Sequence, residues 1–168
     1  MNVVANLDDV VVDTATVREL NKVAALLVEL QSHLKVIDNL GEIAVGRDLE
    51  REFVRMLEWR VAFVARYKGE IIGTAVVRIT PAEEFLDGFV KHPGPLGEIE
   101  FLVVTKKYRA RGVGKKLIAA AEKYFKEAGC TKMEISYLTN NVAAINLYTK
   151  LGYKPVIGTS QKLIPENF

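Results

Sequence analysis

The sequence predicts a single α/β domain, α+β in some schemes, with a mixed sheet of six or seven strands flanked by helices. The chain has 168 residues, of which 49% are hydrophobic. This content is enough to fill one hydrophobic core, and the chain is too short for a second independent domain. Apolar residues repeat at helical spacing early in the chain and at strand spacing later. A strand, helix and strand in succession over 98–138 predict two parallel strands, in contrast to an antiparallel hairpin before them.

The chain begins with weak patterns and then a helix. Residues 1–9 have no clear period and are expected to form at most an extension, whereas 10–12 are typical of a short strand. Thr16 followed three residues later by Glu19 is a capping-box pattern that predicts a helix start. The expected core-facing stripe of this helix is Val17, Leu20, Val23, Ala24, Leu27 and Leu30.

A second amphipathic helix is expected over 49–59, before the sheet proper. Two β-rich runs, 61–67 and 71–79, are joined by Lys68 and Gly69 closely enough to form a hairpin. Proline and glycine interrupt any period over 81–97, which is expected to be a long surface loop.

The second half of the chain is expected to alternate strands and helices. We predict a strand over 98–104, a helix over 112–128, a strand over 133–138 and a helix over 141–151. The remaining residues contain enough valine, isoleucine and leucine for one or two terminal strands. The domain is therefore expected to span 1–168.

Composition excludes several classes of protein. The formal charge is only +2 with 26% charged residues, so neither a nucleic-acid partner nor a membrane partner is expected. Cys130 is the single cysteine, which excludes an intrachain disulfide and argues against a structural zinc site. No leader or spanning apolar run is visible, and we expect a cytoplasmic protein without a metal.

A glycine-rich turn with basic residues separates the strand at 98–104 from the next helix. It contains Arg109, Gly112 and Gly114, and two lysines follow. Glycine lets a backbone approach an anion, and the unpaired N–H groups and dipole of a helix start favour negative charge. The turn indicates a phosphate group, although an ordinary turn with solvated basic residues is the alternative. The dinucleotide and nucleoside triphosphate loop patterns are both incomplete here.

Arg109, Gly112 and Gly114 resemble the Arg/Gln-x-x-Gly-x-Gly/Ala signature of the GNAT superfamily of N-acetyltransferases. A second signature of that family is also present, with helix, strand and helix in the family's order. Its matching positions are Asn141, Ala144, Tyr148, Gly152 and Tyr153. The resemblance is strongest over 98–153, and it implies a GNAT-like fold with acetyl-CoA as cosubstrate.

The resemblance implies that a strand backbone pairs with the pantetheine arm of acetyl-CoA and that the glycine turn holds the pyrophosphate. Asn141 would lie beside the cosubstrate, with a helix N-cap as the alternative role and Asn140 as the alternative residue. The implied contacts to the cosubstrate come from Leu102, Val103, Val104, Arg109, Arg111, Gly112, Val113, Gly114, Lys115, Asn141, Ala144 and Tyr148.

The reaction needs a base, because a primary amine resembling lysine has a pKa of about 10.4 and is mostly protonated at neutral pH. Glu98 is the first candidate and Glu100 the second, and a strand-edge salt bridge is the alternative role for both. A bulge near Phe101 to Val103, common in the family, would change which glutamate faces inward.

The resemblance makes Tyr148 the acid that protonates the leaving thiolate, with a packed aromatic as the alternative. The resemblance also implies that a backbone N–H near Leu102 to Val104 stabilises the oxyanion.

The expected function is transfer of an acetyl group from acetyl-CoA to a primary amine of a small molecule or a peptide. A non-catalytic acyl-CoA-binding module and a nucleotide-binding module are the alternatives, and an acyl group longer than acetyl stays open. Glu83, Glu84 and Asp87 favour a cationic acceptor, and a solvated surface loop is the alternative explanation of their charge. A homodimer is the default expectation for assembly, since it is common in the family. His33 and His92 are weaker candidates for the base.

Overall fold

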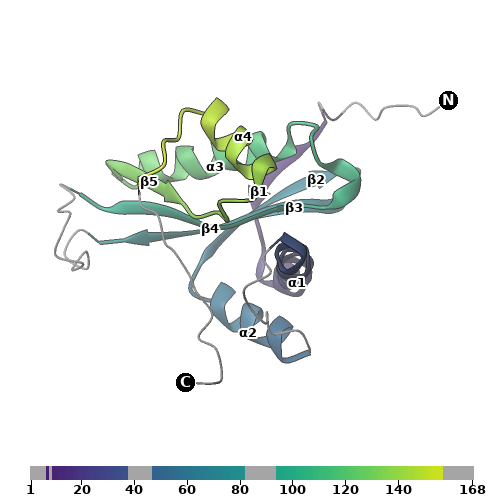
Figure 1. Ribbon diagram of the computed structural model, residues 1–168. Coiled ribbons are helices and arrows are strands. Elements are labelled where there is room, and N and C mark those ends of the chain that lie inside the picture. The colour runs from purple at the N-terminus through teal and green to yellow at the C-terminus, as the bar shows by residue number, and fades with distance from the viewer. Residues whose placement is uncertain (1–6, 8, 38–46, 82–93, 157–168) are drawn as a thin grey trace, which may run out of the picture.

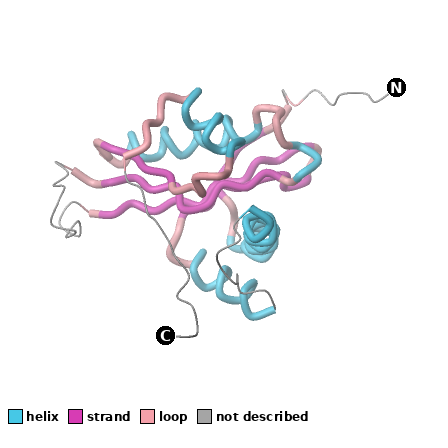
Figure 2. The backbone as a smooth tube through the Cα atoms, in the orientation of Figure 1, coloured by secondary structure: helices cyan, strands magenta, loops and turns pink. Residues whose placement is uncertain are grey.

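The computed structural model describes residues 7, 9–37, 47–81 and 94–156, and it forms one mixed sheet between two layers of helices (Figures 1 and 2). Five strands lie in the order β1-β2-β3-β4-β5, and only β4 and β5 are parallel. Their bounds are Val11–Thr14, Val61–Tyr67, Glu70–Thr80, Leu96–Val104 and Lys132–Ile135. The mixed α/β fold is confirmed, and the described residues contribute five strands to the sheet, against six or seven expected for the whole chain. The predicted terminal strands do not start within 153–156, and 157–168 lie outside the described residues.

Two helices cover each face of the sheet (Figure 1). One face carries α1, Leu20–Ile37, and α2, Arg47–Leu57, while the other carries α3, Val113–Glu127, and α4, Val142–Lys150. Two short 3-10 helices, η1 at Val17–Glu19 and η3 at Lys106–Tyr108, lead into α1 and follow β4. None of the helices in the described ranges is both long and apolar enough to span a bilayer.

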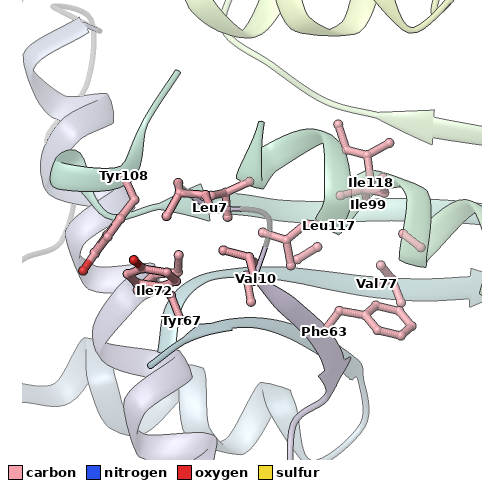
Figure 3. Packing of buried hydrophobic residues seen from close by; sticks show 14 of the residues in the cluster. Leu7, Val10, Phe63, Tyr67, Ile72, Val77, Ile99, Tyr108, Leu117 and Ile118 are labelled. Carbon is pink, nitrogen blue, oxygen red and sulfur yellow. The ribbon is translucent and has the colours of Figure 1, made fainter. Parts of the chain in front are cut away.

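Alternate residues of the strands point to opposite faces of the sheet and pack into two separate cores, as expected for a sheet covered on both faces. The larger core lies under α3 and is shown in Figure 3, where Leu117 and Ile118 of the helix pack toward Ile99 of the sheet. The smaller core lies under α1 and α2 and includes Val23, Leu27, Phe53, Leu57, Val64, Val76 and Val103.

The described part of the N-terminal segment belongs to the larger core. Leu7 is 8% exposed and Val10 is 6% exposed, and both appear in that core in Figure 3. The Nζ atom of Lys116 on α3 donates to the carbonyl oxygens of Leu7 at 3.1 Å and Val10 at 3.2 Å. Leu7, which lies in the expected extension, is therefore a core residue, whereas Asp9 is exposed.

The start of α1 differs from the sequence prediction. The predicted core residue Val17 is 84% exposed, because residues 17–19 form a 3-10 turn that does not share the phase of the α-helix. The Glu19 carboxylate accepts from the Thr16 N–H at 2.9 Å, as the capping pattern predicted. Further along the stripe, Val23 and Leu27 are fully buried as expected.

The strand β4 begins two residues earlier than the prediction, at Leu96. The predicted loop 81–97 therefore overlaps it, and 82–93 lie outside the described residues. Gly97 explains the difference, because a Cβ atom there would lie 2.4 Å from Cγ of the buried Phe125. A glycine in this strand is a packing requirement rather than a loop feature.

Candidate active site

The parallel strands β4 and β5 separate part of the way along β4. They pair from Leu96 with Lys132 as far as Ile99 with Ile135, and β4 then continues to Val104. Among the residues that the structure describes, the side of β4 that faces β5 consequently has no strand partner beyond Ile99. An unpaired edge of this kind can hydrogen-bond an extended ligand as an additional strand would.

The register of β3 and β4 decides which backbone groups face this open edge. The N–H of Thr105 donates to the Ile72 carbonyl oxygen at 2.9 Å, and hydrogen-bonded pairs alternate along antiparallel strands. Val103, opposite Thr74, therefore directs its N–H and C=O toward β3. Leu102 directs both of its groups toward the open edge and Val104 directs its N–H there, whereas the Val104 carbonyl oxygen already accepts from Arg109. Two of the three predicted strand residues therefore offer backbone groups at this edge.

A tight turn carries the chain from β4 to the start of α3. Ala110 and Gly112 both adopt left-handed backbone conformations, with φ of 58° and 83°. The N–H of Lys116 donates to the Gly112 carbonyl oxygen at 3.1 Å, so the N–H groups of 113–115 precede the first bond of the helix. Three N–H groups at the start of a helix are an arrangement that can bind an anion.

Gly114 lies where α3, α4 and β4 converge. A Cβ atom at this position would lie 3.4 Å from Leu147 and 4.0 Å from Val104, which are ordinary contact distances. The fold therefore has room for alanine here, and packing alone does not require the glycine. Arg111 and Lys115 are exposed beside it, whereas Val113 is 2% exposed and packs into the core.

Two of the basic residues near the turn make contacts within the protein. The Nε atom of Arg109 donates to the Val104 carbonyl oxygen at 2.8 Å, and its Nη2 atom lies 3.4 Å from Glu29 of α1. Arg109 thus ties the end of β4 to the turn and to α1, while Lys116 binds the N-terminal segment. Arg111 and Lys115 are better placed to supply charge to a bound anion.

The two candidate bases form a network with two arginines on the α1/α2 face of the sheet. Glu98 accepts from Nη2 of Arg78 at 3.0 Å and from the Thr80 hydroxyl. Glu100 accepts from Nε of Arg60 at 2.5 Å, and its Oε1 atom also lies 3.2 Å from Nε of Arg78. Neither carboxylate is isolated, so the salt-bridge role considered for both is present.

A β-bulge sets the direction of these side chains. Val76 pairs with Phe101 and Val77 pairs with Ile99, which leaves Glu100 as the extra residue in β4. The bulge lies one residue before the expected segment, and it keeps Glu98 and Glu100 on one face, where both contact the same arginine. Phe101 then packs against Phe53 of α2, with ring centroids 5.7 Å apart.

Tyr148 of α4 is buried and packs beside two other tyrosines. It is 7% exposed, with ring centroids 5.6 Å from Tyr137 and 6.1 Å from Tyr153. Burial raises the pKa of Tyr148 to about 12, and the neighbouring Tyr137 contributes. Tyr148 is therefore a neutral hydrogen-bond donor throughout the physiological range, and it also has the packing role considered for it.

The start of α4 is capped by the predicted asparagine. The Oδ1 atom of Asn141 accepts from the Ala144 N–H at 3.2 Å, which is the N-cap role considered as its alternative. This hydrogen bond explains the spacing of these two motif positions in structural terms. Their contact with the cosubstrate stays a prediction.

The GNAT acetyltransferase family model matches residues 34–153. The chain belongs to the GNAT acetyltransferase family. An N-alpha-acetyltransferase of Arabidopsis thaliana is 31% identical over 94 residues, which are 56% of this chain and 45% of that protein. The glucosamine 6-phosphate N-acetyltransferase of Trypanosoma brucei brucei is 28% identical over 131 residues, 75% of this chain and 83% of that protein. A putative acetyl transferase from Pyrococcus furiosus shares the fold, with a TM-score of 0.71 at 21% identity over 93% of this chain and 100% of that one.

The chain spans less than half the length of its Arabidopsis relative but most of the trypanosomal one. The resemblance to the GNAT family drawn from the two sequence motifs is confirmed. In this GNAT domain α3 and α4 lie on the same side of the sheet (Figure 1), and Gly114 at the start of α3 lies beside Leu147 of α4.

Sequence reasoning missed Arg60, Arg78 and Thr80, which hold the two glutamates of the GNAT domain. Arg78 stands opposite Glu98 in the β3 and β4 register, so the hairpin pattern together with an assumed strand pairing could have found it. Arg60 precedes β2 by one residue, and nothing in the local sequence indicates its partner. Tyr137 was also missed, because it follows β5 outside both motifs.

Other candidates contribute little to this GNAT site. His33 is exposed on α1, and His92 lies outside the described residues. Burial raises the pKa of the Cys130 thiol, which disfavours a reactive thiolate.

No group of three or more metal-binding side chains occurs in the part of the chain that the structure describes. An open depression of about 420 Å³ between α1 and the β2-β3 turn contains none of the predicted site residues.

Proposed function

We propose that this chain transfers an acetyl group from acetyl-CoA to a primary amine of a small molecule or a peptide. The observation that carries the proposal is the separation of β4 from β5 next to the anion-binding start of α3. One feature offers backbone hydrogen bonds to an extended arm, and the other offers N–H groups to a pyrophosphate. Acetyl-CoA contains both groups in one molecule.

The residues of the site fit acetyl-CoA on several counts. Leu102 and Val104 have backbone groups on the open edge, and Gly112 begins the helix without a side chain that would cover the N–H groups. Arg111 and Lys115 are exposed beside those groups and would pair with phosphate charges. When bound, acetyl-CoA supplies the activated acetyl thioester, and every other requirement of the reaction falls to the chain itself.

Accepting a proton from the amine is the role we propose for Glu98. A primary ammonium with a pKa of about 10.4 must lose a proton before its nitrogen can attack a carbonyl carbon. Glu98 is 24% exposed at its side chain and is held by Arg78 and Thr80, so it receives the proton directly only if part of this pairing loosens. A water molecule bridging the amine and Glu98 would avoid that cost. Glu100 is the second candidate.

Donating to the departing sulfur is the role we propose for Tyr148. A thiol has a pKa of about 8.5, so full proton transfer from a tyrosine of pKa about 12 is uphill by roughly 5 kcal/mol. Tyr148 therefore acts first as a hydrogen-bond donor to the developing negative charge on sulfur. The carbon–sulfur bond then breaks, the thiolate leaves with this hydrogen bond in place, and the one proton that it finally takes up comes from solvent, so Tyr148 keeps its own.

The kind of acceptor atom is inferred from the names of the relatives. Both curated relatives described above are named as N-acetyltransferases, which supports nitrogen as the acceptor atom. The acidic residues that favoured a cationic acceptor, Glu83, Glu84 and Asp87, lie outside the described residues. A non-catalytic acyl-CoA-binding module would keep the open edge and the helix start without turning over an acceptor.

The test begins with the melting temperature in the presence of acetyl-CoA, CoA, dephospho-CoA or ATP, since a ligand of the folded state stabilises it by mass action. We expect a clear rise with acetyl-CoA and CoA, a smaller rise with dephospho-CoA and none with ATP. No rise with either CoA compound at saturation would refute the proposal. A rise with ATP alone would instead support nucleotide binding.

Turnover then separates an enzyme from a binding module. Release of free thiol from acetyl-CoA is measured across a panel of primary amines, with propionyl-CoA as a second donor. We expect Tyr148→Phe to lower kcat by roughly 100-fold, typical of a lost proton donor, while leaving the CoA-induced stabilisation intact. Binding without turnover of any amine would favour the regulatory module.

A further inference from the structure

The network around Arg78 differs from the site expected for a simple cationic amine. It contains two guanidinium groups, of Arg60 and Arg78, and two carboxylates, of Glu98 and Glu100. These four described groups have a formal charge of zero. An acceptor that brings only an ammonium therefore meets no net attraction, and it must compete with arginines for each carboxylate.

Arg78 has the most exposed side chain of the four residues in this network. Its side chain is 40% exposed, against 23% for Arg60 and 20–24% for the two glutamates. Its Nη2 atom binds Glu98, whereas its buried Nε atom has no hydrogen-bond partner within the described residues, although Glu100 lies 3.2 Å away. By contrast, Arg60 donates twice to Glu100 and once to the Trp59 carbonyl oxygen.

A guanidinium group with exposed donors is suited to a planar or tetrahedral anion, because its N–H groups match carboxylate and phosphate oxygens in pairs. Arg78 stands directly opposite Glu98 and beside the Glu100 bulge, where β4 leaves β5. An anionic group bound to Arg78 would therefore lie next to the proposed base. Arg78 lies on the sheet face that also carries α1 and α2, opposite the face covered by α3.

We propose that the acceptor is an amine that also carries a carboxylate or phosphate group, and that Arg78 binds this anionic group. The inference rests on the proposed function and names the substrate class of that site. The zwitterionic acceptor matches the neutral network, with its anion on Arg78 and its ammonium toward Glu98. As the anion takes donors from Arg78, an oxygen of Glu98 becomes available to accept the ammonium proton, which leaves the amine nitrogen with its lone pair.

The experiment compares pairs of amines that differ only in the anionic group. Glucosamine 6-phosphate is paired with glucosamine to probe phosphate, and 4-aminobutyrate is paired with butylamine to probe carboxylate. Acetylation is followed by thiol release at low ionic strength, and binding is followed by the melting temperature of the CoA-loaded protein. We expect the anionic member of at least one pair to have a kcat/KM about tenfold or more above its neutral match, the size of a charge-assisted hydrogen bond. The pair that shows the preference identifies phosphate or carboxylate as the anion.

Variants assign the preference to Arg78. Arg78→Gln should remove the difference within the pair, and Arg78→Lys, which keeps the charge without the paired donors, should keep part of it. Arg66→Gln is the matched control, because Arg66 is also an ion-paired strand arginine but contacts Asp13 and Glu19 near the other edge of the sheet. It should leave the preference unchanged, with all variants measured at a temperature where circular dichroism shows them folded.

Two results would overturn the inference while leaving the proposed function intact. One is equal or better use of the neutral amines, and the other is a preference that survives in Arg78→Gln. If no amine is turned over, the absence of any stabilisation of the CoA-loaded protein by the anionic amines at millimolar concentration also contradicts it. Failure of the proposed function is recognised separately, by the lack of stabilisation with acetyl-CoA and CoA.

Discussion

Replacing Glu19 with glutamine tests the electrostatic anchor at the start of α1. The Glu19 carboxylate accepts from the Thr16 N–H at 2.9 Å and from Nη2 of Arg66 at 2.8 Å. Arg66 of β2 also donates to Asp13 of β1 at 3.0 Å, so two strands and the helix start share these contacts. Glutamine retains an oxygen for the Thr16 N–H but loses the charge that Arg66 pairs with.

The magnitude follows from the pKa of Glu19. The backbone hydrogen bond from Thr16, followed by the Arg66 hydrogen bond, lowers this pKa from 4.5 to about 2. That difference corresponds to at most about 3 kcal/mol of stability. Because the side chain lies at the surface and is 20% exposed, screening reduces the expected contribution to about 1–2 kcal/mol. Since the folded pKa is the lower one, the contribution is complete above pH 4.5 and is lost as the pH falls toward 2.

The assay is the free energy of unfolding in urea for the wild type and Glu19→Gln, measured between neutral pH and the acid range. We expect the variant to be about 1–2 kcal/mol less stable at neutral pH and the gap to close below pH 4.5. Glu50→Gln, an exposed position on α2, is the control and should differ little from the wild type. A gap that stays constant with pH, or no gap at neutral pH, would refute the reasoning.

Three further substitutions separate packing from ligand binding. Gly97→Ala should destabilise the fold by about 3 kcal/mol or more in a urea titration, because the new Cβ atom would overlap the fully buried Phe125 ring. A stability close to that of the wild type would contradict this packing. Gly114→Ala should leave the melting temperature nearly unchanged but reduce the stabilisation by CoA, and equal stabilisation would mean that no ligand approaches this backbone. Arg109→Gln should cost about 1–2 kcal/mol in thermal unfolding, because the Val104 carbonyl loses its charged donor, and it should also weaken CoA binding.

Local patterns predicted the elements whose formation depends on neighbours in the chain. Lys68 and Gly69 do form the hairpin turn, both with positive φ, because a two-residue connection between strands requires that conformation. Gly129 ends α3 with φ of 78°, as its position after the apolar stripe predicted. Val17 was misassigned, since the spacing of apolar residues does not distinguish a 3-10 turn from the first turn of an α-helix.

The fold class, the family and the positions of the turn and helix that carry the two motifs follow from the amino-acid sequence alone, because glycine conformations, helix starts and helical periodicity are encoded within a few residues. The contacts of Glu98 and Glu100 with the same Arg78, and the return of Arg109 to β4, could be identified only in the folded chain. These contacts depend on the pairing of strands distant in the chain, and one extra residue at the Glu100 bulge sets which face the following side chains occupy. The alternation of apolar and polar residues does not show where a bulge occurs. The partners of the proposed base could therefore be identified only from the pairing of the strands in the structure.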